Sequence, residues 1–298
     1  MNVGMMIRIS SLIAVAALAC FASPTEIRGG TTEIPHKSGP STADAAPAVH
    51  LANISTRLAV GGGDNVLIAG FIITGSQPKK VVVRGIGPTL PVNENLADPT
   101  LELHDSTGSI VATNENWRDT QEGELKATTI PPANDYESGI VKTLNPGAYT
   151  AILAGKGGTT GVGVVEVYDL DLTVDSKLAN IATRGRVNQG DDVLIGGTIV
   201  VGSGSTTVLF RALGPSTGIA SALQDPTLEL YNGQGSQIAN NDNWQDTQED
   251  AITATTIPPP NPREAAILRQ LTPGAYTAIV RGKNNTTGVG LIEAYQIN

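Results

Sequence analysis

The sequence has almost no cysteine: the single one, Cys20, lies ahead of every segment that predicts a folded core. Thiol catalysis, thiolate-bound metals and disulfides are therefore excluded within residues 51–298. Arg8 precedes an apolar run over residues 12–22, which is too short to span a bilayer as a helix. These features predict a secretory signal peptide over residues 1–23. Lipid anchoring through Cys20 is an open alternative.

Basic and aromatic residues are also scarce. The 298 residues include 19 Lys and Arg against 28 Asp and Glu, a net charge of −9, and the basic residues form no local cluster. Because an acidic surface repels phosphate backbones, we do not expect nucleic-acid binding. Aromatic residues make up 4% of the chain, whereas Gly (34) and Pro (18) are abundant. This composition favours a core of Val, Ile, Leu and Ala in short strands joined by turns.

Several of the usual catalytic motifs are absent from the sequence. It contains no His-Glu-x-x-His, no phosphate-binding loop and no dinucleotide fingerprint. The only histidine within the repeats described next is His104, and its counterpart in the second repeat is Tyr231. A lone histidine on a predicted strand beside a turn is typical of a surface residue. We therefore expect a protein that is not an enzyme and has no cofactor, with Ca²⁺ as the one exception considered below.

An internal repeat sets the organisation of the chain. The segment Leu-Ala-Asn-Ile-Ser-Thr-Arg at residues 51–57 returns at residues 178–184 with one substitution, and Asp-Pro-Thr-Leu-Glu-Leu at 98–103 returns at 225–230. Each pair is offset by 127 residues, and roughly half of the aligned positions are identical. Units of this length bury their own core, unlike the shorter repeats of solenoids. We predict a disordered tether over 24–50, repeat 1 over 51–171, a linker over 172–177 and repeat 2 over 178–298.

Each repeat carries about eight strand signals, apolar segments bounded by Gly, Pro, Asn and Asp. In repeat 1 they cover residues 51–58, 66–74, 80–86, 100–104, 109–113, 140–144, 148–154 and 162–170. The pattern predicts an all-β fold of two tandem antiparallel, jelly-roll-like β-sandwich domains. Residues 120–126 are an exception, because their polar helix formers predict a single helical turn capped by Asp119 or Thr120.

Charged residues recur inside apolar strand segments. They are Arg84, Glu102 and Glu166 in repeat 1, and Arg211, Glu229 and Glu293 in repeat 2. A carboxylate–guanidinium bridge is the simplest way to satisfy such charges in a sandwich, so we predict structural ion pairs among these residues. The alternative is that Glu102 and Glu166 are the acid and base of a glycosidase-like hydrolase.

A loop rich in side-chain oxygens occurs in both repeats. Its candidate ligand-binding residues are Asn114, Asn116, Trp117, Asp119 and Glu122 in repeat 1, and Asn241, Asp242, Asn243, Trp244, Asp246 and Glu249 in repeat 2. Such oxygens suit Ca²⁺, which is one interpretation of residues 114–122 and 241–249. The other is that these side chains cap backbone groups in Asx turns and at helix N-termini. We expect each tryptophan to close the open end of its sandwich, with a sugar-stacking platform as the alternative.

Three segments of repeat 1 resemble the bacterial pre-peptidase C-terminal (PPC) domain. They are Asp98 to Asp105, Gly108 to Asn114, and Pro146 to Ile152. The resemblance covers about the last 70 residues of each repeat and leaves residues 51–88 unexplained. It implies an exported β-sandwich accessory module, usually found beside a catalytic domain such as a secreted peptidase, with no catalytic residues of its own. In the present sequence only the predicted tether and signal peptide precede the repeats.

These observations favour a non-catalytic binding or structural module that is secreted or displayed at the cell surface. We expect it to contact extracellular polysaccharide, matrix or protein partners, and two repeats favour bivalent attachment. A secreted hydrolase is one alternative. A subunit of an extracellular filament, in which edge strands join neighbouring molecules, is the other. The sequence leaves the ligand and the oligomeric state open.

Overall fold

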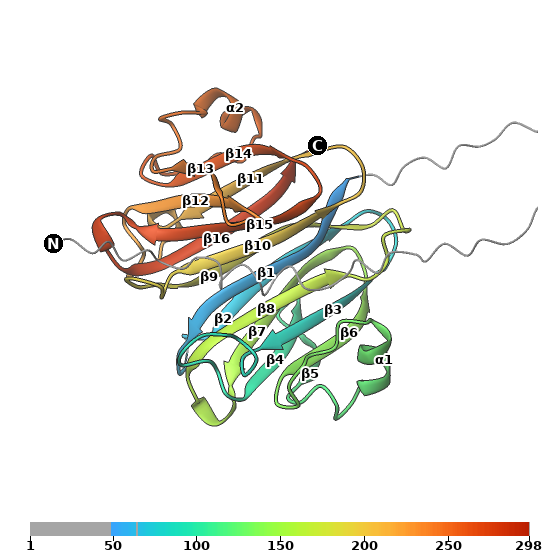
Figure 1. The fold of residues 1–298 in the computed structure, drawn as a ribbon. Coiled ribbons are helices and arrows are strands. Elements are labelled where there is room, and N and C mark those ends of the chain that lie inside the picture. The colour runs from blue at the N-terminus through green and yellow to red at the C-terminus, as the bar shows by residue number, and fades with distance from the viewer. Residues whose placement is uncertain (1–48, 64, 298) are drawn as a thin grey trace, which may run out of the picture.

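The computed structural model describes residues 49–63 and 65–297. The predicted signal peptide and nearly all of the predicted tether lie outside these residues. The described part of the chain consists of antiparallel β-strands with a few short helices, which confirms the all-β class predicted from the sequence (Figure 1). Within it, no helix combines the length and the apolar character needed to cross a membrane.

Each repeat contributes eight strands and one short α-helix. The elements of repeat 1 are β1 (His50–Val60), β2 (Leu67–Thr74), β3 (Lys79–Ile86), β4 (Pro99–Asp105), β5 (Ile110–Asn114), α1 (Glu122–Ala127), β6 (Ser138–Leu144), β7 (Gly147–Gly155), η2 (Lys156–Gly158) and β8 (Gly161–Asp169). Those of repeat 2 are β9 (Lys177–Val187), β10 (Leu194–Val201), β11 (Thr206–Leu213), η3 (Pro215–Thr217), β12 (Pro226–Asn232), β13 (Gln237–Asn241), α2 (Glu249–Ala254), β14 (Ala265–Leu271), β15 (Gly274–Gly282), η4 (Lys283–Asn285) and β16 (Gly288–Ile297).

All eight strands predicted in repeat 1 are present, and β1 begins one residue earlier than predicted, at His50. The predicted helical turn is also present, as α1, but its predicted cap is wrong. The residue at the N-cap is Gln121, whose side chain makes no capping hydrogen bond. The side chains of Asp119 and Thr120 bond to asparagines of the preceding loop instead, so they are not available to the helix.

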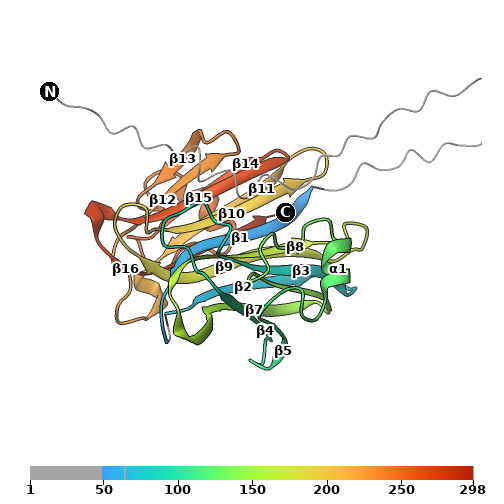
Figure 2. The same cartoon turned by 60° about the horizontal axis from the view of Figure 1, so that its bottom comes forward.

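The strands form two eight-stranded sheets, and each sheet contains strands of both repeats. Sheet I has the order β6-β3-β8-β1-β10-β15-β12-β13. Sheet II has the order β14-β11-β16-β9-β2-β7-β4-β5. A single bridge between Leu51 and Leu178 connects the two. Repeat 1, blue to green, and repeat 2, yellow to red, meet along β1, β2, β9 and β10 (Figures 1 and 2).

The strand pairs that cross the repeat boundary are related by the sequence repeat. β1 pairs with β10, and the counterpart of β1, β9, pairs with β2, the counterpart of β10. Ser55 lies opposite Gly197, just as Ala182 lies opposite Gly70. The repeats are thus related by a pseudo-twofold axis, like the subunits of an isologous dimer. The predicted arrangement as two separate sandwiches joined by a linker is not confirmed, because strand ladders run across the boundary.

The core between the sheets is continuous across that boundary. Along β2, the alternate residues Leu67, Ala69, Phe71 and Ile73 point inward and are at most 2% exposed. The same cluster takes in buried residues of strands from both repeats. It consists mainly of Val, Ile, Leu and Ala, as the shortage of aromatic residues predicts.

Side chains of the polar loops cover two sheet edges. At β6, Gln121 donates from Nε2 to the Val141 carbonyl oxygen at 2.9 Å and accepts the Val141 N–H at Oε1 at 3.0 Å. Gln248 forms the same two bonds with Leu268 of β14. Each amide therefore takes the place of a neighbouring strand. The other sheet ends are β5 and β13, and Ile110 of β5 is 57% exposed.

Candidate functional site

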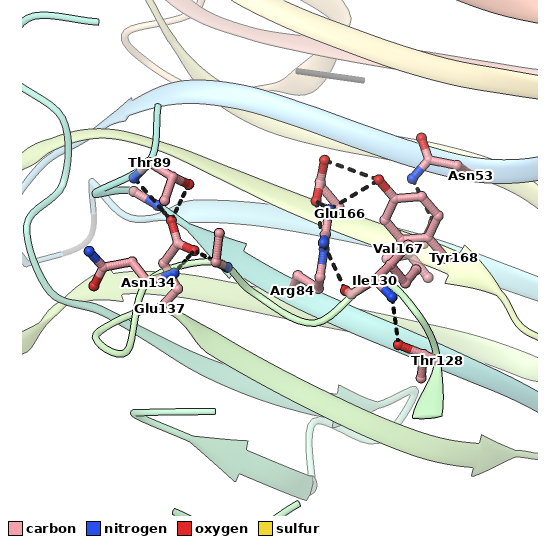
Figure 3. Close-up of polar contacts among 12 residues, drawn as sticks. Asn53, Arg84, Thr89, Thr128, Ile130, Asn134, Glu137, Glu166, Val167 and Tyr168 are labelled. Atoms are coloured by element: carbon pink, nitrogen blue, oxygen red, sulfur yellow. Dashed lines mark hydrogen bonds and ion pairs between the residues drawn. The ribbon is translucent and has the colours of Figure 1, made fainter. Parts of the chain in front are cut away.

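The predicted ion pair of repeat 1 lies on the outer face of sheet I. Arg84 of β3 and Glu166 of β8 are directly opposite each other. Arg84 donates from Nε to Glu166 Oε2 at 2.9 Å, from Nη2 to the same oxygen, and from Nη1 to the Ile130 carbonyl at 2.8 Å (Figure 3). Tyr168 donates from its hydroxyl to Glu166 Oε1 at 3.3 Å, and its ring centroid lies 5.0 Å from the guanidinium carbon. The pairing of Arg84 with Glu166 is confirmed.

Repeat 2 builds the same group from Arg211, Glu293 and Tyr295. Arg211 donates from Nε to Glu293 Oε2 at 2.8 Å and from Nη1 to the Ile257 carbonyl at 2.7 Å. The Tyr295 hydroxyl donates to Glu293 Oε1 at 2.9 Å. The second predicted pair is therefore confirmed as well.

Burial and the neighbouring carboxylates set the electrostatics of these groups. Burial acts to lower the pKa of Arg84, but Glu166 outweighs it, and the pKa is raised. Burial and Glu166 raise the pKa of Tyr168, and burial and Glu293 do the same for Tyr295. The arginine therefore stays charged and the phenols stay protonated at neutral pH. Each group is a closed structural pair with its donors engaged within the protein.

The prediction that Glu102 and Glu229 belong to these pairs is wrong. Glu102 has a 48% exposed side chain and bonds to Nε2 of His104 at 2.9 Å. Glu229 accepts the Tyr231 hydroxyl at 2.8 Å and lies 3.6 Å from Nε of Arg281. Both glutamates contact residues near the ends of their sheets, distant in topology from Arg84 and Arg211.

The carboxylates of Glu102 and Glu166 do not form the pair that the hydrolase alternative requires. Glu102 lies on β4 of sheet II, and Glu166 lies on β8 of sheet I. The neighbours of each along its strand, such as Leu103 and Val167, point into the shared core. Because side chains alternate along a strand, the two carboxylates point away from each other on opposite faces of the sandwich.

The oxygen-rich loop of repeat 1 directs its asparagine side chains to backbone groups and to another loop side chain. Asn114 accepts the Gly139 N–H at 2.8 Å and donates to the Asn116 carbonyl at 3.1 Å. Asn116 donates to Asp119 Oδ2 at 3.0 Å. In repeat 2 the equivalent bonds join Asn241 to Ala266 and Asn243, and Asn243 to Asp246. Asn114 and Asn241 thus bond to backbone groups, as the capping interpretation expects, whereas Asp119 and Asp246 accept from asparagine side chains.

The remaining acidic residues of the loops pair with cations or amides. Glu122 lies 2.7 Å from Arg118 and from Lys126, Asp242 lies 2.5 Å from Lys283, and Glu249 accepts from Gln245 at 2.7 Å. Among the described residues, no three His, Cys, Asp or Glu side chains gather closely enough to hold a metal ion. A calcium site in these loops stays a prediction for calorimetric titration.

Both tryptophans are buried. Trp117 is 2% exposed and Trp244 is 8% exposed, so neither presents an indole face to a sugar. Trp117 packs against Val82, Leu125 and Val141 in a small second core beneath α1, on the outer face of sheet I. The expectation that it closes the open end of the sandwich is therefore wrong. It holds the α1 segment over the sheet that carries Arg84.

Sequence reasoning missed a buried glutamate that ties two loops together. Glu137 is 0% exposed and accepts the backbone N–H groups of Gly87 and Thr89 at one carboxylate oxygen and those of residues 133 and 134 at the other (Figure 3). Glu264 occupies the same position in repeat 2 and accepts the backbone N–H groups of Gly214 and Ser216. The signal was present, since a glutamate recurs just ahead of the β6 and β14 segments.

Two neighbouring hollows lie between the repeats. One, of about 500 Å³, lies on the outer face of sheet II, where Gly70 of β2 and Ala182 of β9 form a floor of small residues. The other, of about 610 Å³, lies beside the ends of β1 and β9. Arg184 and Ile219 line both, so the hollows adjoin. We call the combined feature the inter-repeat groove.

Arg184 differs from its counterpart, Arg57, in its contacts. Arg57 donates to the carbonyl of Asp191 at 3.2 Å, and burial lowers its pKa. Arg281 holds the same turn by donating to the Gly190 carbonyl at 2.8 Å, whereas its counterpart in repeat 1 is Ala154. Arg184 is exposed and makes no hydrogen bond or ion pair with any other residue in 49–63 or 65–297. The pseudo-symmetry is therefore broken at the groove.

Comparisons with known proteins add little. No family model matches the chain, and no curated protein matches it. Among solved structures, the crystal structure of a DUF4785 family protein from Legionella pneumophila subsp. pneumophila str. Philadelphia 1 aligns with 91% of this chain and 71% of its own. The sequence identity is 11% and the TM-score is 0.24, a likeness too low to carry an argument. The resemblance to the PPC domain stays a prediction.

Proposed function

We propose that the protein is a secreted, non-catalytic binding module whose ligand site is the inter-repeat groove. The observation that carries this proposal is that strands of both repeats line one groove, and that the arginine shared by its two hollows has no partner among the described residues. Hollows of several hundred Å³ that combine apolar surface with polar groups are the usual form of a ligand site. The predicted signal peptide and the resemblance to an exported accessory domain support an extracytoplasmic location.

The joined repeats favour one shared ligand site over two separate ones. Two sandwiches on a flexible linker favour bivalent attachment, but here β1 and β9 join the repeats into one body. We therefore propose one composite site at their junction. The counterpart position on sheet I differs, because Arg57 there is bonded to the turn that contains Asp191.

A glycan array, probed with and without Ca²⁺, tests the proposal. The diagnostic variant is Gly70→Val, because a Cβ at Gly70 makes only ordinary contacts, 3.4 Å or longer, while its side chain fills the groove floor. Gly233→Val is the matched control: its Cβ also meets nothing closer than 3.4 Å, and it lies outside the groove. We expect binding by wild type and the control and loss of binding by Gly70→Val. Retained binding by Gly70→Val would show that the ligand site lies outside the groove, which contradicts the proposed location. Absence of binding by wild type would contradict the proposed function itself.

A second candidate function, a filament subunit, rests on the ends of the sheets. Among the described strands, β5 pairs with β4 alone, and Ile110 at its start is 57% exposed. An open strand edge can accept a strand of another molecule. Electron microscopy of concentrated protein would show filaments, and Ile110→Lys should abolish them. Dispersed particles at all concentrations would dismiss this candidate.

A further inference from the structure

The inter-repeat groove has an unusual charge for this chain. The charged residues that line it are Arg184, Arg186 and Arg211, and no Asp or Glu is among its described lining residues. The whole chain carries a net charge of −9, so a groove whose charged lining residues are all basic has the opposite sign to the chain as a whole. Arg211 is neutralised by Glu293, which leaves Arg184 and Arg186 as the free cations.

Arg184 and Arg186 lie two residues apart on β9. Because side chains alternate along a strand, both point to the same side, and both are exposed. Arg186 donates a hydrogen bond from Nε to the neutral amide oxygen of Asn188 at 3.2 Å. Two guanidinium groups on one strand face, without carboxylate partners in the described part of the chain, can each hold an anionic group through paired N–H donors.

The rest of the groove offers both apolar and hydroxyl surfaces. Ile68, Leu213 and Leu291 line it beside the hydroxyl-bearing Thr150 and Ser216. This combination matches a sugar ring, which presents C–H groups on its faces and hydroxyls at its rim. The adjoining hollows of about 500 and 610 Å³ exceed what one small anion would occupy.

We propose that the inter-repeat groove binds a polysaccharide that carries carboxylate groups, with Arg184 and Arg186 as the carboxylate-binding residues; the inference rests on the proposed function and names its ligand class. The chain's overall negative charge opposes densely charged polyanions. Two free arginines suit a polymer in which uronic acid residues alternate with neutral sugars. Arg57 on sheet I is the counterpart of Arg184. It already donates to the Asp191 carbonyl, so it is not offered as a carboxylate-binding residue.

The test compares carboxylated polysaccharides with their own carboxyl-reduced forms by isothermal titration. The probes are hyaluronan, alginate and polygalacturonate oligosaccharides, with heparin as a densely sulfated comparison. We expect at least one carboxylated form to bind about tenfold or more tightly than its reduced form. Arg184→Ala should lower that affinity by about tenfold or more, and Arg184→Lys should restore only part of it, because lysine keeps the charge but lacks the paired donors.

Arg269→Ala is the matched control, since it removes an exposed arginine of β14 outside the groove. It should bind like wild type, and circular dichroism should show that all variants keep the fold. Equal binding of carboxylated and reduced forms, or full binding by Arg184→Ala, would overturn this inference and leave the proposed function standing. Binding to none of the polysaccharides would overturn both. Stronger binding to heparin than to every carboxylated probe would show that the groove prefers sulfate to carboxylate groups, and so contradict the inference.

Discussion

The hydroxyl oxygens of Thr56 and Thr183 lie 2.7 Å apart in the core, and the two threonines occupy the same position in the two repeats. Thr56 belongs to β1 of sheet I and Thr183 to β9 of sheet II. An axis that exchanges two equivalent atoms must pass midway between them, so this hydrogen bond marks the pseudo-twofold axis. The duplication is therefore visible in the structure as a bond between a residue and its own counterpart.

A double-mutant cycle on this pair should show strong coupling. Thr56 is 1% exposed and Thr183 is 0% exposed, so either hydroxyl left alone would be buried without its partner. We expect Thr56→Val or Thr183→Val alone to lower the free energy of unfolding by about 1–3 kcal/mol. The double variant should cost less than the sum of the two, because it removes both polar groups together. Denaturant unfolding measures all four proteins, and additive effects would show that the hydroxyls do not interact.

Repeat 1 produced alone, as residues 49–171, should form a homodimer. In the whole chain, β1 and β2 of repeat 1 each pair with a strand of repeat 2. Without repeat 2 these edges can pair with the same strands of a second copy, which keeps the twofold arrangement. Light scattering after gel filtration should give the dimer mass. A folded monomer under these conditions would show that the cross-boundary pairing needs residues specific to repeat 2.

The same substitution should destabilise the protein at the buried Glu166 and have little effect at the exposed Glu102. Glu166→Gln leaves Arg84 without its carboxylate in a largely buried site, so we expect a loss of about 3–5 kcal/mol in the free energy of unfolding. Glu102→Gln is the matched control, because its side chain is 48% exposed. Its effect should stay within about 0.5 kcal/mol, because an exposed ion pair contributes little to stability. Equal effects of the two substitutions would contradict the assignment.

His104 should make stability depend on pH. Its bonds to the Gly108 carbonyl and then to the Glu102 carboxylate raise its pKa, against burial. Because the pKa is raised on folding, the extra stability is fully present below the unfolded value of about 6.5 and is lost as the pH rises through the folded value. Thermal unfolding from pH 5.5 to pH 8.5 measures it.

The control for that experiment is His104→Tyr, which copies repeat 2. There Tyr231 takes the histidine's place and donates to Glu229 at 2.8 Å, with its pKa raised to about 12 by burial and Glu229. The tyrosine does not titrate between pH 5.5 and pH 8.5. The stability of wild type relative to this variant should therefore fall as the pH rises, and a pH-independent difference would contradict the assignment.

Strand positions were predictable because their signals are local. Alternating apolar residues and turn residues indicate each strand of repeat 1 from β1 to β8, and the structure has all of them. The position of α1 followed from its polar helix formers, but its cap did not. Asp119 and Thr120 had two possible sets of partners, the helix and the preceding loop, and the loop bonds prevail.

The two glutamates on strands show the limit of such signals. Glu102 in Leu-Glu-Leu and Glu166 in Val-Glu-Val both alternate with inward-pointing apolar residues, so both must point outward. The difference lies in what covers the outer face. Over Glu166, the segment that contains Ile130 folds back and supplies a partner for Arg84. Glu102 has no such cover and is half exposed.

The sequence by itself determined the repeat, the strands and the inward and outward faces of each strand, because side-chain alternation and turn chemistry are properties of neighbouring residues. Only the tertiary structure decided that β1 pairs with β10 and β9 with β2. The reason is that the edge of a strand presents the same backbone N–H and C=O groups whatever its residues, so the choice of partner depends on the packing of many distant side chains. The inter-repeat groove and the free Arg184 exist as a result of that choice.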